Sequence, residues 1–181
     1  NVQPWKVFVA SGALKDRLRR QMVEATSGGV TPNPDYPYRG DFSDEYRTRQ
    51  VECAVALYSK MGIGRGDKEG RMRAVLRNFE FFDAPHIAFL GMHADFGPTV
   101  AIDVGMFAQS LMLSMVAFGL HSCPMGTMRN YPDMVREAFE IADGTKILFG
   151  ISFGYEDTSV DANATQTTRD DISANVVFRS E

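Results

Sequence analysis

Apolar residues recur along this chain at two spacings, and each spacing predicts a different kind of element. Leu14, Leu18 and Met22 stand four positions apart with charged residues between them, which is the pattern of a helix with one buried face. Similar stretches that begin or end near serine, glycine or proline predict further helices. The predicted helices cover residues 13–26, 43–61, 67–79, 99–120 and 132–141.

Continuous apolar runs predict buried strands instead, at residues 7–10, 87–90 and 146–153. Proline-rich residues 30–42 show no periodicity and are expected to form a loop. Strands interspersed with helices, in a chain of 181 residues with 44% hydrophobic content, predict a single domain of the α/β or α+β class over residues 1–181.

Residues 99–120 carry apolar side chains on nearly every helical face, and the run is broken by Asp103, Gln109, Ser110 and Ser114. A membrane span needs about 20 mostly apolar residues without such interruptions. We therefore expect a fully buried helix, either in the core or at an interface with another chain.

The polar tail of residues 156–175 ends in the β-prone run Val176-Val177-Phe178. An apolar triplet on a polar arm is well suited to add a strand to an exposed sheet edge. We expect that edge to belong to this chain or to a partner.

Charge, cysteine and histidine content narrow the class of partner. A formal net charge of −4 and a pI near 5.4 argue against nucleic acid or an anionic membrane. The two cysteines form no disulfide framework, and the three histidines stand apart from cysteine or carboxylate clusters, so no metal site is expected. Cys123 precedes Pro124 and is interpreted as packing, not as a nucleophile. Reduced thiols indicate a cytoplasmic protein.

The run Gly62-Ile63-Gly64-Arg65-Gly66 superficially matches a dinucleotide-binding fingerprint. That fingerprint requires a preceding strand and a third glycine at the position of Asp67. Because a predicted helix precedes the run, we interpret it as a flexible helix-to-helix connector.

The opening residues Asn1-Val2-Gln3-Pro4-Trp5 are typical of a ligand-holding loop that leads into a strand. The amides offer donors and acceptors, the proline fixes the backbone, and the tryptophan supplies a flat surface. This run resembles the Asn-x-Gln-Pro-Trp segment of the FMN-dependent nitroreductase family, which is normally preceded by Pro-Ser. The resemblance implies that Asn1 and Gln3 contact the flavin, often from the partner subunit.

Residues 119–126, Gly-Leu-His-Ser-Cys-Pro-Met-Gly, resemble the family segment that passes the flavin edge. The match implies that a backbone N–H of Met125 or Gly126 faces the flavin N5 or the neighbouring carbonyl, with Pro124 fixing the backbone. Many relatives carry Glu or Gln nearby, where this chain has Met-Gly. A flavin contact through the backbone is compatible with this difference, whereas a role for a Glu or Gln side chain is not. Without the resemblance this segment reads as a plain loop.

Residues 36–82, which include Tyr36 and Tyr38, resemble the variable, aromatic-rich region that covers the active site of the family. Asn78 is a further candidate for a flavin contact. Substrate preference is therefore expected to reside in the region that is hardest to interpret.

The tail run from Asn163 to Arg169 resembles the C-terminal signature Asn-x-x-Arg-x-x-Arg. The second arginine of that signature reaches the FMN phosphate and corresponds to Arg169. The first is Gln166 here, a departure that removes one cationic contact. Without the family match, a tail arginine reads as a solvated surface charge.

Family members usually carry a further N-terminal stretch with an Arg-x-Ser-x-Arg run that holds phosphate and the flavin pyrimidine edge. That stretch is not in the printed sequence, and we expect the printed sequence to be part of a longer protein.

The resemblance implies an α+β nitroreductase fold, with a central mixed β-sheet flanked by helices, in an intertwined homodimer with two FMN sites at the interface. The implied activity is the NAD(P)H-driven reduction of nitroaromatic or quinone-like acceptors by ping-pong hydride transfer, with no catalytic side chain. Enoate reduction or reductive dehalogenation on the same fold is an alternative, as is a flavin-binding dimer without turnover.

Overall fold

The computed structural model describes residues 1–37, 40–142 and 144–180. The chain divides into two compact units, which we call the sheet unit (residues 1–39 and 69–156) and the tail unit (residues 40–68 and 157–181). The organisation of residues 1–181 as one flavin-binding domain stays a prediction.

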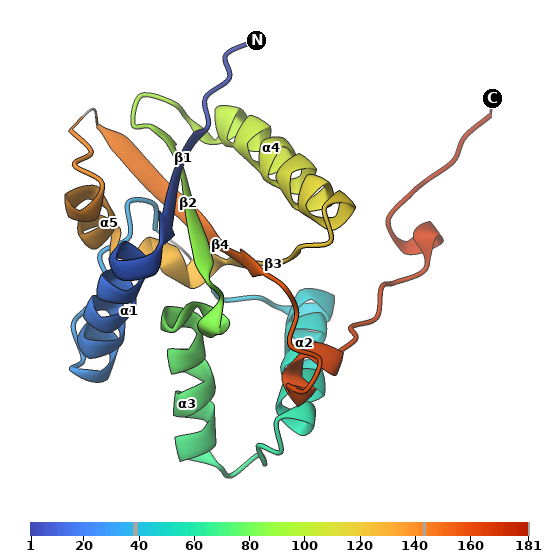
Figure 1. Cartoon of the computed structure of the whole chain (residues 1–181). Coiled ribbons are helices and arrows are strands. Elements are labelled where there is room, and N and C mark those ends of the chain that lie inside the picture. The colour runs from blue at the N-terminus through green and yellow to red at the C-terminus, as the bar shows by residue number, and fades with distance from the viewer. Residues whose placement is uncertain (38–39, 143, 181) are drawn as a thin grey trace. The chain divides into compact units, whose positions relative to one another are not determined.

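The sheet unit is built on four strands in the order β1-β2-β4-β3, and every neighbouring pair is antiparallel (Figure 1). The strands are β1 (Lys6–Ser11), β2 (His86–His93), β3 (His121–Met125) and β4 (Thr145–Gly154). Three of them confirm the predicted strands, whereas β3 lies where the pattern alone indicated a loop. Pro124 fits β3 because an edge strand makes ladder hydrogen bonds on one side only.

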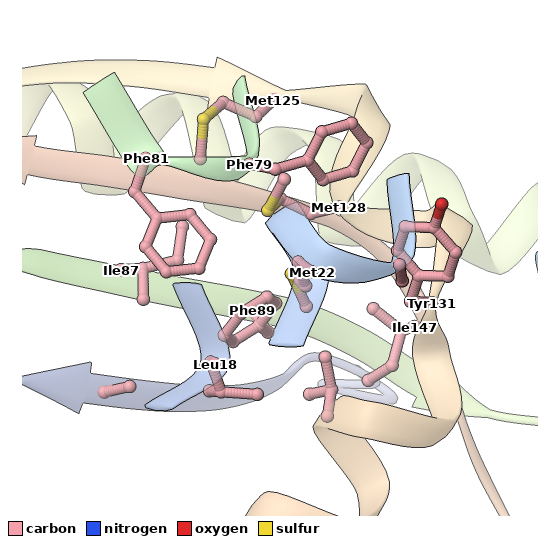
Figure 2. Close-up of a cluster of buried hydrophobic side chains, with 13 residues drawn as sticks. Leu18, Met22, Phe79, Phe81, Ile87, Phe89, Met125, Met128, Tyr131 and Ile147 are labelled. Carbon is pink, nitrogen blue, oxygen red and sulfur yellow. The ribbon is translucent and has the colours of Figure 1, made fainter. Parts of the chain in front are cut away.

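Helices cover both faces of this sheet, and β2 is buried on both as a result. Ile87 and Phe89 of β2 lie in a first apolar cluster with Leu18 and Met22 (Figure 2). Leu90 lies in a second cluster, which includes Val104 and Ala108 of α4. Alternate side chains of a strand point to opposite faces, so a continuous apolar run is what a strand covered on both faces requires. The helices and turns of this unit are α1 (Gly12–Ser27), α3 (Lys68–Phe79), η1 (Phe81–Asp83), α4 (Pro98–Ala117), η2 (Gly126–Asn130) and α5 (Pro132–Ala138).

The expectation that residues 7–10 form a buried strand is wrong in one respect, because β1 is an edge strand. Val9 is 51% exposed, and Ala10 is the buried residue of β1. A short apolar run alone does not tell an edge strand from a central one.

The core alternative for residues 99–120 is also wrong. α4 buries Val104, Ala108 and Met115, whereas Ile102 and Leu113 are 60–61% exposed. By length and composition alone, α4 could also cross a membrane. The interface alternative for this helix stays a prediction.

The tail unit contains α2 (Asp44–Lys60) and the short turns η3 (Asp161–Ala164) and η4 (Ile172–Ala174). Ser43 is the N-cap residue of α2, but its side chain makes no capping hydrogen bond. Gly62 follows the helix with a φ of +68°, a left-handed conformation that favours glycine. Val177 and Phe178 are 79–80% exposed and lie outside the strands, so their addition to a sheet edge stays a prediction.

Candidate functional site

Asn1 and Gln3 lie at the exposed start of a segment whose next two residues are anchored. Pro4 is buried, and Trp5 stacks on Phe107 of α4 with ring centroids 4.9 Å apart and an interplanar angle of 9°. Gln3 has a φ of +50°, in the left-handed region that non-glycine residues rarely adopt. A strained residue beside rigid neighbours is typical of a segment that positions a ligand. Both predicted amides thus lie just ahead of two residues that packing anchors.

Residues 124–126 pass from β3 into η2, and packing behind them fixes this path. Met125 is buried and pairs with Gly150 of β4. A Cβ added at Gly150 would lie 2.6 Å from Cγ of Met128, so the glycine lets η2 pack directly on the sheet. Gly126 is exposed, and the nearest atom to an added Cβ would be Nη1 of Arg129 at 3.6 Å. The backbone at Gly126 is therefore open to a ligand.

Asn78 of α3 lies beside this segment. Its Nδ2 donates to the carbonyls of Ala74 and Val75 at 3.3 Å, and its Oδ1 accepts from Oγ1 of Thr127 at 3.5 Å. The sequence-predicted Asn78 and Gly126 are thus brought together through Thr127, the neighbour of Gly126. Thr127 was missed by sequence reasoning, since no pattern distinguishes it from a surface threonine.

The turn that follows Asn78 is strained and held by ion pairs. Phe81, Phe82 and Asp83 have φ values of +56°, +53° and +61°. Arg77 contacts the carboxylates of Asp83 at 2.8 Å and Glu80 at 2.7 Å, and its hydrogen bond lowers the pKa of Asp83. Left-handed backbone costs about 1–2 kcal/mol per residue, so this turn persists because burial of Phe81 and the ion pairs hold it.

The proline-rich loop is anchored to the sheet unit by Asp35. Its carboxylate lies 2.7 Å from Nη1 of Arg136 and accepts the backbone N–H of Ile147 at 2.8 Å. The next residue, Tyr36, packs against the second apolar cluster with its hydroxyl buried and unpartnered among the described residues. Tyr38 lies outside the described residues.

Arg169 lies in the tail unit, in a cavity of about 770 Å³ between α2 and the tail. Its Nη1 donates to Oγ1 of Thr167 and to the carbonyl of Thr168, both at 2.9 Å. Arg49 of α2 lines the same cavity and forms an ion pair with Asp170. Sequence reasoning placed Arg49 only within the region 36–82 and gave it no role beside Arg169, because the tail signature carries no information about which helix faces it.

Cys123 lies in surroundings that disfavour its reactive form. The residue is solvent-accessible, but desolvation raises the pKa of its thiol, so the thiolate is disfavoured near neutral pH. The absence of a catalytic side chain stays a prediction.

Comparison with known proteins identifies the family. The sequence profile described as "Nitroreductase family" matches residues 1–155. Nitroreductase NfnB of Mycolicibacterium smegmatis is 36% identical over 180 residues, covering 98% of this chain and 76% of its own length. The chloronitrobenzene nitroreductase of Comamonas testosteroni is 30% identical, covering 100% of this chain and 81% of its own.

Solved structures agree with the sequence matches. The FMN-dependent nitroreductase NfnB from Mycobacterium smegmatis, in complex with NADPH, aligns with a TM-score of 0.93 at 34% identity, over 99% of this chain and 80% of that one. The FMN- and NADPH-dependent NfnB from a Sphingopyxis strain aligns with a TM-score of 0.92 at 28% identity, over 99% and 82%. The α+β nitroreductase fold implied by the resemblance is confirmed, and the chain belongs to the nitroreductase family.

Proposed function

We propose that this chain is an FMN-dependent oxidoreductase that uses NAD(P)H to reduce nitroaromatic or quinone-like acceptors. The observation that carries the proposal is the alignment over 99% of the chain with an FMN-dependent nitroreductase that binds NADPH. The names of the relatives, which include two 4-nitrobenzoate reductases, support a nitroaromatic acceptor.

The donors of the sheet unit fit the ring of FMN. The exposed amides of Asn1 and Gln3, and the amide of Asn78, suit the carbonyl and N–H edge of an isoalloxazine. The open backbone at Gly126 allows the close approach that a contact through an N–H requires. Pro124 and buried Met125 hold that backbone in place.

The guanidinium of Arg169, in the tail unit, suits a phosphate such as that of FMN, because arginine binds phosphate through charge-assisted and often bidentate hydrogen bonds. When bound, FMN supplies the redox chemistry by accepting a hydride from NAD(P)H and passing it to the acceptor. The residues of the chain bind and orient the cofactor, and none is required as a nucleophile or as a side-chain acid.

The enzyme acts as a homodimer with its flavin sites at the interface. Supporting this, α4 exposes Ile102, Met106, Leu113 and Val116, and an apolar stripe of this kind marks an interaction surface. Leu113→Glu together with Val116→Glu is expected to give a monomer in analytical ultracentrifugation, whereas the parent sediments as a dimer. A parent that sediments as a monomer would contradict the dimer.

A cytoplasmic location suits both the supply of NAD(P)H and two free cysteines.

The visible spectrum and turnover of the purified protein test the proposed function. We expect flavin absorbance in the protein, and oxidation of NADPH that depends on added nitrobenzene. Protein stripped of flavin should lose this activity and regain it with FMN. A colourless protein that neither binds FMN nor oxidises NADPH would refute the proposal.

A further inference from the structure

The cavity of the tail unit contains a second arginine whose role the proposed function leaves unexplained. Arg49 reaches the cavity from α2, and Arg169 reaches it from the tail, so the two guanidinium groups come from segments more than 100 positions apart in sequence. Gln166 lines the same cavity, as do the carboxylates of Glu52 and Asp170. The cavity volume of about 770 Å³ leaves room for a phosphorylated group.

The departure at Gln166 makes Arg49 informative. The tail signature of this chain has one cation fewer than the pattern it resembles, because glutamine stands at position 166. Arg49 restores a second guanidinium in the cavity that Gln166 lines. Two arginines can surround a phosphate dianion with charge-assisted bonds, which one arginine and a neutral amide do less well.

Within the tail unit Arg49 is occupied by an internal anion. Asp170 forms an ion pair with it, and the two side chains are 38–41% exposed. A pair this exposed contributes little stability, so an incoming dianion can replace the carboxylate. Arg169 is engaged only by the neutral oxygens of Thr167 and Thr168 in the contacts described above.

We propose that Arg49 and Arg169 together form a phosphomonoester-binding site in which Asp170 competes with the ligand for Arg49. The inference rests on the proposed function, since two ligands of such an enzyme carry a phosphomonoester: FMN at its 5′ end and NADPH at its 2′ position. Asp170 then sets the affinity of the site by holding Arg49 until the phosphate arrives.

The test compares each ligand with its analogue that lacks the phosphomonoester. FMN and riboflavin are titrated into the flavin-free protein by fluorescence, and KM is measured for NADPH and NADH in the holoenzyme. Arg49→Ala is expected to weaken FMN about tenfold or more with riboflavin unchanged, or to raise KM for NADPH by that factor with NADH unchanged. The first pattern assigns the site to the flavin phosphate, in line with the role proposed for Arg169. The second assigns it to the nucleotide and overturns the assignment of Arg169 to the flavin phosphate.

The charge of Asp170 gives the proposal a signed prediction. Asp170→Asn should tighten the same phosphorylated ligand about two- to fivefold, because it releases Arg49. If Arg49 and Asp170 formed only a structural ion pair, Asp170→Asn would weaken binding of the ligand instead. Arg49→Lys should recover part of the loss, and it keeps the test interpretable if the alanine variant is unstable.

Arg47→Ala is the matched control, because Arg47 lies on the same helix, bonds to Gln50 and does not line the cavity. It should leave unchanged both the ratio of FMN affinity to riboflavin affinity and the ratio of KM for NADPH to KM for NADH. The inference is overturned if Arg49→Ala changes neither ratio, or if Asp170→Asn weakens binding. If the parent protein itself binds no FMN and oxidises no NADPH, the proposed function fails. If the parent is active and the Arg49 variant matches it, only the inference about Arg49 fails.

Discussion

Removal of the Asp35 carboxylate should destabilise the sheet unit far more than removal of the neighbouring Asp133. Both carboxylates contact Arg136, Asp35 at 2.7 Å and Asp133 at 2.6 Å. The side chain of Asp35 is 5% exposed and that of Asp133 is 71% exposed. The two contacts to Arg136 are nearly equal in length, but Asp35 is buried, accepts the backbone N–H of Ile147 as well, and lies 3.5 Å from Nζ of Lys146.

The magnitude follows from the contacts that each variant removes. Asp35→Ala loses the bond to Arg136 and leaves the N–H of Ile147 without its acceptor. Hydrogen bonds to charged groups contribute about 1.5–3 kcal/mol each, and breaking a buried ion pair costs about 3–5 kcal/mol, so we expect a loss of about 3–5 kcal/mol. Asp133→Ala should cost about 1 kcal/mol or less, since it removes a solvent-screened pair.

Urea unfolding of the holoenzyme, at fixed protein and FMN concentrations, measures both losses as shifts in the transition midpoint at an unchanged m-value. Asp35→Asn should fall between the parent and Asp35→Ala, because the amide oxygen can still accept from Ile147. Equal losses for Asp35→Ala and Asp133→Ala would refute the argument, as burial would then have no influence on this pair of contacts.

Three further predictions concern the cofactor, the kinetics and the acid limit of stability. Arg169→Ala should weaken FMN binding roughly ten- to a hundredfold and purify pale, and added FMN should restore its activity. Arg169→Lys should recover only part of the lost FMN affinity. An unchanged affinity in Arg169→Ala would make Arg169 a surface charge. Initial rates with varied NADPH and nitrobenzene should give parallel double-reciprocal lines, and intersecting lines would exclude a shared site. The pKa of Asp83 is lowered by Arg77, so Asp83 stabilises the fold above the unfolded carboxyl pKa of about 3.9, and this contribution disappears as the pH falls through the lower folded pKa. Asp83→Asn should reduce the loss of stability between pH 5 and pH 2 in thermal melts, and an unaltered acid limb would contradict this.

The elements were predictable where one physical cause dominates the pattern. Residues 87–90 form part of β2 as expected, because burial on both faces demands a continuous apolar run. The same reasoning misjudged β1, since an edge strand and a central strand can share an apolar run. For α4 the composition indicated burial but not by what, and its apolar residues Ile102 and Leu113 are exposed within the part of the chain that the structure describes.

Sequence reasoning singled out candidate site residues one by one, but it did not predict the contacts that hold them. Asn78 and Gly126 stood out one by one, yet the bond from Thr127 that joins them depends on how η2 packs against Gly150. The left-handed turn at Phe81–Asp83 has no sequence signal, because its residues are not glycines and its cause is burial and ion pairing.

Arg49 illustrates the same limit of sequence reasoning for the charge of a binding site. A signature along the tail registers Gln166 as a lost cation, whereas the fold places an arginine from α2 in the same cavity. Because electrostatic attraction depends on distance in space and not on position in the chain, a phosphate site can keep its charge while its motif changes. Substitutions within such a motif therefore have to be judged against the cations that other elements bring to the same cavity.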